Sequence, residues 1–156
     1  MRDALLRDIS NLNGMEVTVT HDARLPPPKY ANQTIPVKHN DDVWQVWSQC
    51  MANADAVWPI APETGGVLSQ LTELANKHDK ALLGCSLQAV NLTSSKYATY
   101  QALQAAGICT VPTFKLVDWP QHSANAWVAK PDGGVGCEDS GYFESAQELL
   151  NWMQQG

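Results

Sequence analysis

The chain begins with an amphipathic helical pattern followed by an alternating one. Leu5, Ile9 and Leu12 recur at helical spacing, and Asn13-Gly14 then ends the predicted helix. Over residues 15–20 every second position is apolar, as in a strand with one buried face. The first elements are therefore predicted to be a helix and a strand.

Proline interrupts this periodic pattern before it resumes. Residues 23–36 carry too many prolines for a helix and are predicted to form a loop. A second helix, capped by Asn40 or Asp41, is predicted to run through Met51. The short apolar run over 56–61 is typical of a buried parallel strand, although the proline inside it bends or ends that strand.

The same alternation continues beyond the middle of the chain. A third helix is predicted over 67–75 and a short strand over 81–83. Alternating strands and helices predict an α/β sandwich with parallel strands. The next helix is capped by Thr93 or Ser94 and ended by Gly107, after which the pattern changes.

This change of pattern places a domain boundary near residue 90. Two extended segments then flank a glycine turn, and a capping box from Ser145 to Glu148 opens the last helix. We therefore expect an α/β domain over 1–90, with helices on both faces of a parallel sheet. A smaller α+β domain is expected over 91–156.

Composition narrows the class of protein. A net charge of -6 argues against a general nucleic-acid surface, and no apolar run approaches the roughly 20 residues of a membrane span. The charged start lacks the apolar core of a secretory signal, and the four widely spaced cysteines lack a Cys-x-x-Cys motif. We expect a cytoplasmic protein with reduced thiols, no structural zinc, and neither a membrane nor a nucleic-acid partner.

Two lysines and a glycine-rich turn form the best candidate for chemistry. A triphosphate needs cations to offset its charge and backbone N–H groups that no side chain obstructs. Both are available from five residues, which are Lys96, Lys130, Gly133, Gly134 and Gly136. Two alternatives stay open at this point: a glycine-bearing hairpin that needs no ligand, and a solvated surface lysine at position 96.

In combination these residues resemble the ATP-grasp superfamily of ligases over nearly the whole chain. The matching pattern comprises Lys96, Gly107-Ile108, Val111-Pro112-Thr113, and the segment from Val128 to Gly136. Trp58 to Thr64 and Leu83 to Ser86 further resemble a narrower group that includes tyramine-glutamate ligase and relatives of methanopterin-type one-carbon metabolism. The resemblance implies a Rossmann-like preceding domain over 1–90 and a first ATP-grasp subdomain over 91–156.

The resemblance also implies ATP and Mg²⁺ as cofactors and small-molecule carboxylate and amine substrates, joined through an acyl phosphate. Lys96 and Lys130 would hold the nucleotide phosphates, and the turn bearing Gly133, Gly134 and Gly136 would close over them. The adenine hinge and the metal ligands of the family would follow residue 156, so we expect this chain alone to be inactive. The alternative is a degenerate module that binds a nucleotide or a partner without catalysis.

Several carboxylates have both functional and structural interpretations. Glu63 follows an apolar strand, where it would meet a substrate amine or cap the next helix, and the cap is favoured. Asp22 and Arg24 follow a strand end in the same way, where they would pair with each other or meet substrate, and the pair is favoured. Glu138 and Asp139 are expected to point to opposite faces of a strand and to form no metal pair. Unpaired sheet edges predict homo-oligomers, and the glycine turn is expected to have few contacts and therefore to be mobile.

Overall fold

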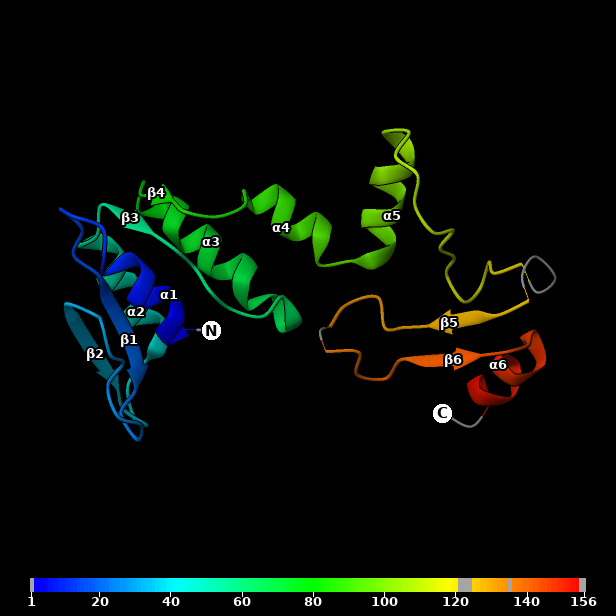
Figure 1. The fold of residues 1–156 in the computed structure, drawn as a ribbon, viewed down its shortest axis with the longest axis horizontal. Coiled ribbons are helices and arrows are strands. Elements are labelled where there is room, and N and C mark those ends of the chain that lie inside the picture. Colours follow the sequence, from blue (N-terminus) through cyan, green and yellow to red (C-terminus); the bar gives the residue numbers. More distant parts are fainter. Residues whose placement is uncertain (1, 121–124, 135, 155–156) are drawn as a thin grey trace. The chain divides into compact units, whose positions relative to one another are not determined.

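The computed structural model describes residues 2–120, 125–134 and 136–154 (Figure 1). The chain forms two compact units: Met1–Val57 with Leu74–Ala81, and Trp58–Glu73 with Leu82–Gly156. We refer to them as the first and the second unit. The chain contains both helices and short strands, interspersed along its length, which confirms the predicted α/β class. No helix in the described part combines the length and apolar character needed to cross a membrane.

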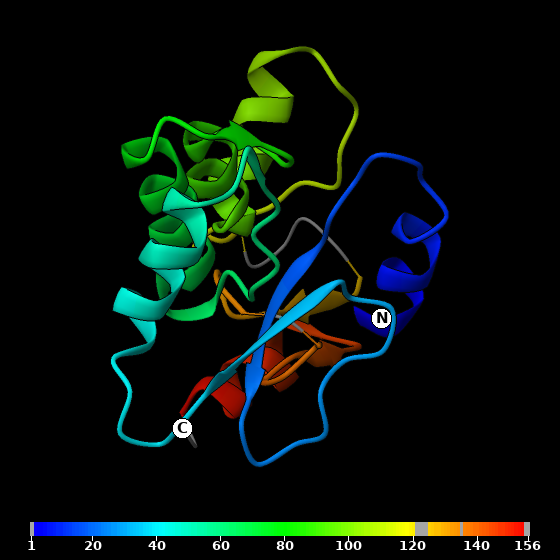
Figure 2. The ribbon, with the colours of Figure 1, turned by 90° about the vertical axis from the view of Figure 1, so that its left-hand side faces the viewer.

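The first unit is built around a parallel pair of strands. Strand β1 (Thr18–Asp22) lies beside strand β2 (Gln33–Val37), with Val19 opposite Thr34 in the register (Figure 2). The loop predicted over 23–36 is therefore wrong at its end. Pro36 is tolerated in β2 because both strands of a two-stranded sheet are edge strands, where a missing N–H costs least.

The second helix of the first unit confirms the predicted helical periodicity with a shift in its cap, whereas the first helix ends at Ile9, before the predicted stop at Asn13-Gly14. Helix α1 spans Arg2–Ile9 and helix α2 spans Val43–Ala52. The N-cap of α2 is Asp42, whose carboxylate accepts hydrogen bonds from the N–H groups of Trp44 and Gln45, rather than the predicted Asn40 or Asp41. Asp41 instead accepts a bond from the Lys38 N–H in the preceding turn.

Side chains from α2 form the interior of the first unit. The Trp47 indole N–H donates to the Thr20 hydroxyl of β1 at 3.2 Å. Met51 is buried, and Ser48 Oγ lies 2.8 Å from the His78 Nε2. These contacts join α2 to β1 and to the segment that follows helix α3 (Val67–Lys77).

The central strands are shorter than predicted. Strand β3 covers only Ala56–Val57 and pairs with strand β4 (Ala81–Leu82). Trp58-Pro59 follows β3 directly, and proline supplies no N–H to a ladder, which explains why the strand predicted over 56–61 ends early. A single 3₁₀ turn, η1 (Thr64–Gly66), then leads into α3.

The second unit contains a helix that the sequence pattern did not reveal. Helix α4 spans Leu87–Thr93, and helix α5 follows it over Lys96–Ala105. The cap of α5 is Ser95, not Thr93 or Ser94, because those two residues still belong to the last turn of α4 and its end. Gly107 ends α5 with φ 70, which confirms the predicted glycine stop.

A two-stranded hairpin and a helix complete the second unit. Strands β5 (Trp127–Ala129) and β6 (Gly141–Phe143) are antiparallel, as predicted, and helix α6 spans Ala146–Met153 (Figure 1). Ser145 caps α6 by accepting the Glu148 N–H, which confirms half of the predicted capping box. The Glu148 carboxylate reaches one residue further back, to the N–H of Glu144.

Candidate functional site

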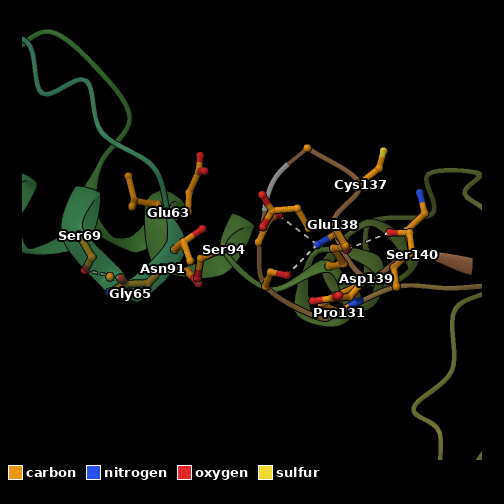
Figure 3. A pocket seen from close by; sticks show the side chains of 18 of the residues that line it. Glu63, Gly65, Ser69, Asn91, Ser94, Pro131, Cys137, Glu138, Asp139 and Ser140 are labelled. Carbon is orange, nitrogen blue, oxygen red and sulfur yellow. Dashed lines mark hydrogen bonds between the residues drawn. The ribbon is translucent and has the colours of Figure 1, made fainter. Parts of the chain in front are cut away.

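A pocket of about 800 Å³ lies entirely within the second unit. Its walls come from the η1 turn and the start of α3, from α4, from the first residue of α5, and from the loop between β5 and β6 (Figure 3). All six residues proposed from the sequence line it, namely Glu63, Lys96, Lys130, Gly133, Gly134 and Gly136. The fold thus brings together residues that are far apart in the chain.

Lys96 is the first residue of α5 and reaches across to the glycine turn. Its Nζ donates to the backbone carbonyls of Asp132, Gly133 and Gly134, each at 3.3 Å. The side chain is exposed, and these three carbonyls are its partners in the second unit. Three acceptors at this distance hold the ammonium group weakly and leave it able to exchange partners.

Asp132 fastens the same turn to the start of α5. Its Oδ1 accepts the Tyr97 N–H at 2.8 Å, its Oδ2 accepts the Ser95 hydroxyl at 2.7 Å, and its backbone carbonyl accepts the Lys96 N–H at 3.0 Å. These bonds, first from the Tyr97 N–H and then from the Ser95 hydroxyl, lower the pKa of the Asp132 carboxyl. The expectation that the turn has few contacts is therefore wrong at Asp132, Gly133 and Gly134.

The glycines of the turn meet a backbone requirement. Gly134 has φ 99 and Gly136 has φ 75, a region that side chains with a Cβ rarely occupy. A Cβ at Gly133 would lie 3.7 Å from the Ser94 carbonyl oxygen, an ordinary contact. Among the described residues, no acceptor is found for the N–H groups of these three glycines, so they remain available to an anion.

Lys130 supplies the second cation of the pocket. It directly follows β5, so the strand pairing with β6 determines where its backbone lies. The side chain is exposed, as required of a group that meets a charged ligand from solvent. The hairpin thus carries Lys130 at its beginning and the glycine turn a few residues later.

Three carboxylates that line the pocket do not have the structural roles predicted from the sequence. Glu63 makes no capping hydrogen bond with its side chain, so the favoured helix cap is wrong. Glu138 and Asp139 lie in the turn after Gly136 rather than on a strand, and both line the pocket (Figure 3). Their side chains therefore do not alternate between the faces of a strand, since Asp139 has φ 50.

Polar residues of α3 and α4 complete the lining and were not identified from the sequence. The Ser69 hydroxyl donates to the Asn91 Oδ1 at 2.6 Å, which joins the two helices at the pocket wall (Figure 3). Ser94 lies beside them at the end of α4. Because the sequence pattern predicted α3 but not α4, the contact between these two helices could not be predicted.

Metal ligands are not clustered in the described part of the chain. No group of three or more His, Cys, Asp or Glu side chains there is placed to hold a metal ion. His21, His39 and His78 belong to that part, whereas His122 lies outside the described residues.

Asp22 and Arg24 form the structural pair that we expected. The Arg24 guanidinium and backbone N–H donate to the Asp22 carboxylate, and these bonds lower the pKa of that carboxyl to about 2. Because the folded-state pKa lies below the ordinary value of 3.8, the pair stabilises the fold above about pH 4 and is lost as the pH falls toward 2.

We predict a carboxyl titration midpoint for Asp22 near 2 in the unaltered chain. Arg24→Ala should raise it toward 3.8, as followed by NMR of the carboxyl carbon. A midpoint near 3.8 before the substitution would show that the pair does not form in solution.

Comparison with known proteins supports the superfamily indicated by the motifs. Residues 15–90 match the model of the pre ATP-grasp 3 domain family. The fold is similar to the biotin carboxylase domain of 2-oxoglutarate carboxylase from Hydrogenobacter thermophilus, solved as a dimer with MgADP, ADP and bicarbonate, at a TM-score of 0.74 and 15% identity. The match covers 98% of this chain and 37% of that one. No curated protein matches the sequence.

Together these findings place the chain's fold with the N-terminal part of an ATP-grasp enzyme. They agree with the class that the two lysines and the glycine turn indicated. They do not extend to the narrower tyramine-glutamate ligase group.

Proposed function

We propose that the pocket of the second unit binds the phosphates of ATP and forms the first half of the active site of a carboxylate-amine ligase. The observation that carries this proposal is that Lys96, Lys130 and the three glycines of the turn line one pocket. Their chemistry matches a triphosphate, which needs both cations and unobstructed N–H donors.

The charges of the pocket lining explain why Mg²⁺ would accompany the nucleotide. Among the described residues that line the pocket, two lysines face three carboxylates, namely Glu63, Glu138 and Asp139. The lysines alone therefore leave most of the phosphate charge without a counter-charge. A divalent cation carried by the triphosphate supplies the missing positive charge.

The proposed reaction gives each residue of this chain a limited role. ATP supplies the phosphoryl group: a substrate carboxylate oxygen bonds to the terminal phosphorus, and ADP leaves with the electrons of the broken P–O bond. The substrate amine then attacks the resulting acyl phosphate, phosphate leaves, and the nitrogen loses a proton. Lys96, Lys130 and the glycine N–H groups hold the phosphates and offset their charge, which is the main task in phosphoryl transfer.

The remaining parts of this proposal concern the organisation of the enzyme. We propose a preceding domain over 1–90 and a first ATP-grasp subdomain over 91–156, with Glu63 facing the substrate amine. The chain spans 37% of the biotin carboxylase chain that it resembles, so the adenine and metal contacts would come from elsewhere in the functional enzyme. On this proposal the isolated chain binds nucleotide without turnover. The substrates would be a small-molecule carboxylate and a small-molecule amine, in an enzyme of the group that includes tyramine-glutamate ligase.

One observation favours a second candidate. The Lys96 ammonium already has three carbonyl acceptors, so the lysine and the turn have a structural role that needs no ligand. In that case the hairpin would be a rigid structural turn, and the chain would be a non-catalytic module that binds a partner.

Nucleotide titration separates the two candidates. If the pocket binds phosphates, the affinity of the chain should fall in the order ATP, ADP, AMP in the presence of Mg²⁺, because each removed phosphate removes contacts with the lysines and the turn. Isothermal titration calorimetry measures these affinities. Equal binding of ATP and AMP, or no binding of either, would leave the structural role as the better account.

A further inference from the structure

We propose that Asp132 is a positioning residue for the nucleotide site, which fastens the glycine turn to α5 and thereby sets the direction of the turn's N–H groups. The expected effect of Asp132 on nucleotide binding rests on the proposed function. The attachment of the turn to α5 rests only on hydrogen bonds within the second unit. Nothing in the sequence pattern assigned Asp132 a role.

The Asp132 carboxylate bonds directly to the start of α5. Asp132 accepts one bond from the N–H of Tyr97 and one from the Ser95 hydroxyl, at 2.8 and 2.7 Å. Bonds of this length to an ionised carboxylate are charge-assisted and roughly twice as strong as neutral ones. The carboxylate also lies at the positive end of the α5 dipole, so it offsets the charge that the helix start and Lys96 place there.

The Asp132 carboxylate limits which donors of the pocket remain for a phosphate group. Because Asp132 already occupies the start of α5, a phosphate group does not bind there. The remaining donors are the two lysines and the N–H groups of Gly133, Gly134 and Gly136. The pocket therefore depends on how the turn presents these amides.

The N–H groups of the glycine turn have a defined direction. Lys96 Nζ contacts the carbonyls of Asp132 and Gly133 on one side of the turn. In a trans peptide unit the N–H points opposite to the C=O, so the N–H groups of Gly133 and Gly134 point away from Lys96. Asp132 keeps the turn within reach of Lys96, and its bonds to Ser95, Lys96 and Tyr97 fix this orientation.

Three variants test the role of Asp132. Asp132→Ala removes both carboxylate acceptors, whereas Asp132→Asn keeps an oxygen for the Tyr97 N–H and removes the charge. Asp55→Asn is the matched control, because it makes the same charge change at an exposed position outside the pocket. Far-UV circular dichroism establishes that each variant folds.

Two measurements need no nucleotide. In Asp132→Ala, the amide of Tyr97 should exchange its hydrogen about tenfold faster, as expected for the loss of a bond to a charged acceptor. Lys96 should also become several-fold more reactive toward an acetylating reagent, relative to Lys130 in the same molecule. Asp132→Asn should lie between Asp132→Ala and the unaltered chain, and Asp55→Asn should change neither readout.

A third measurement links Asp132 to nucleotide binding. Asp132→Ala should weaken MgATP binding about tenfold, although its side chain is not proposed to touch the phosphates. Unchanged exchange at Tyr97 and unchanged reactivity of Lys96 would overturn the positioning role. Equal MgATP affinities of Asp132→Ala and the unaltered chain would also overturn it. If the unaltered chain binds no MgATP, the proposed function fails, and the first two measurements alone decide the role of Asp132.

Discussion

Replacing Lys130 by alanine is expected to weaken MgATP binding by about 10-fold to 100-fold. The expectation follows from the 1.5–3 kcal/mol that a hydrogen bond to a charged group typically contributes, where about 1.4 kcal/mol is a tenfold change. Lys130 is exposed on the pocket wall, so its removal should not disturb the interior of the second unit. Calorimetric titration at a fixed, low salt concentration measures the effect.

Lys96→Ala should weaken binding to a similar extent and change a second property as well. Because its Nζ contacts three carbonyls of the turn, the substitution should also accelerate hydrogen exchange of the turn amides. Lys38→Ala is the control, since Lys38 is an exposed lysine of the first unit outside the pocket. If all three variants bound MgATP equally, the pocket would not be the nucleotide site.

The largest loss of stability is expected from Phe143→Ala, at about 3–5 kcal/mol in the free energy of unfolding. Phe143 is 9% exposed, and its ring centroid lies 5.4 Å from that of Trp152 on α6. Small domains are stable by only about 5–15 kcal/mol, so the variant is expected to lose much of the second unit's stability. Urea unfolding followed by tryptophan fluorescence measures the change.

Tyr142→Ala provides a matched control on the adjacent residue. Tyr142 is 65% exposed and points to the opposite face of β6, so its removal should cost less than about 1 kcal/mol. Comparable losses from the two variants would mean that α6 does not pack on the Phe143 face of the hairpin. A small loss from Phe143→Ala alone would lead to the same conclusion.

The elements that could be predicted from the sequence are those decided by local chemistry. Ser145 caps α6 because its hydroxyl reaches an N–H three residues later, and Gly107 ends α5 because it has no Cβ to oppose a positive φ. β2 and α4 could not be predicted in this way. Gln33–Val37 becomes a strand only because β1 offers it a partner, and Leu87–Thr93 is too short for a clear helical period.

In the candidate site, likewise, some residues could be predicted from the sequence and others could not. Lysines and glycines indicate phosphate binding by residue type alone, and the structure places them on one pocket. Asp132 carries no such signal, because its importance depends on contact with Ser95 and Tyr97, which lie far from it in sequence. Glu138 and Asp139 were misread because the turn extends further than the strand pattern suggested.

The separation between Asp132 and the start of α5 has a consequence for the order of folding. The bond from Tyr97 to Asp132 spans 35 positions, whereas Ser95 caps the same helix from a neighbouring residue. Closing a long loop costs entropy before its contact forms, so the local cap forms first and the distant one later. During synthesis α5 would emerge with only its own serine cap, and the pocket would assemble when the hairpin docks on a helix that already exists.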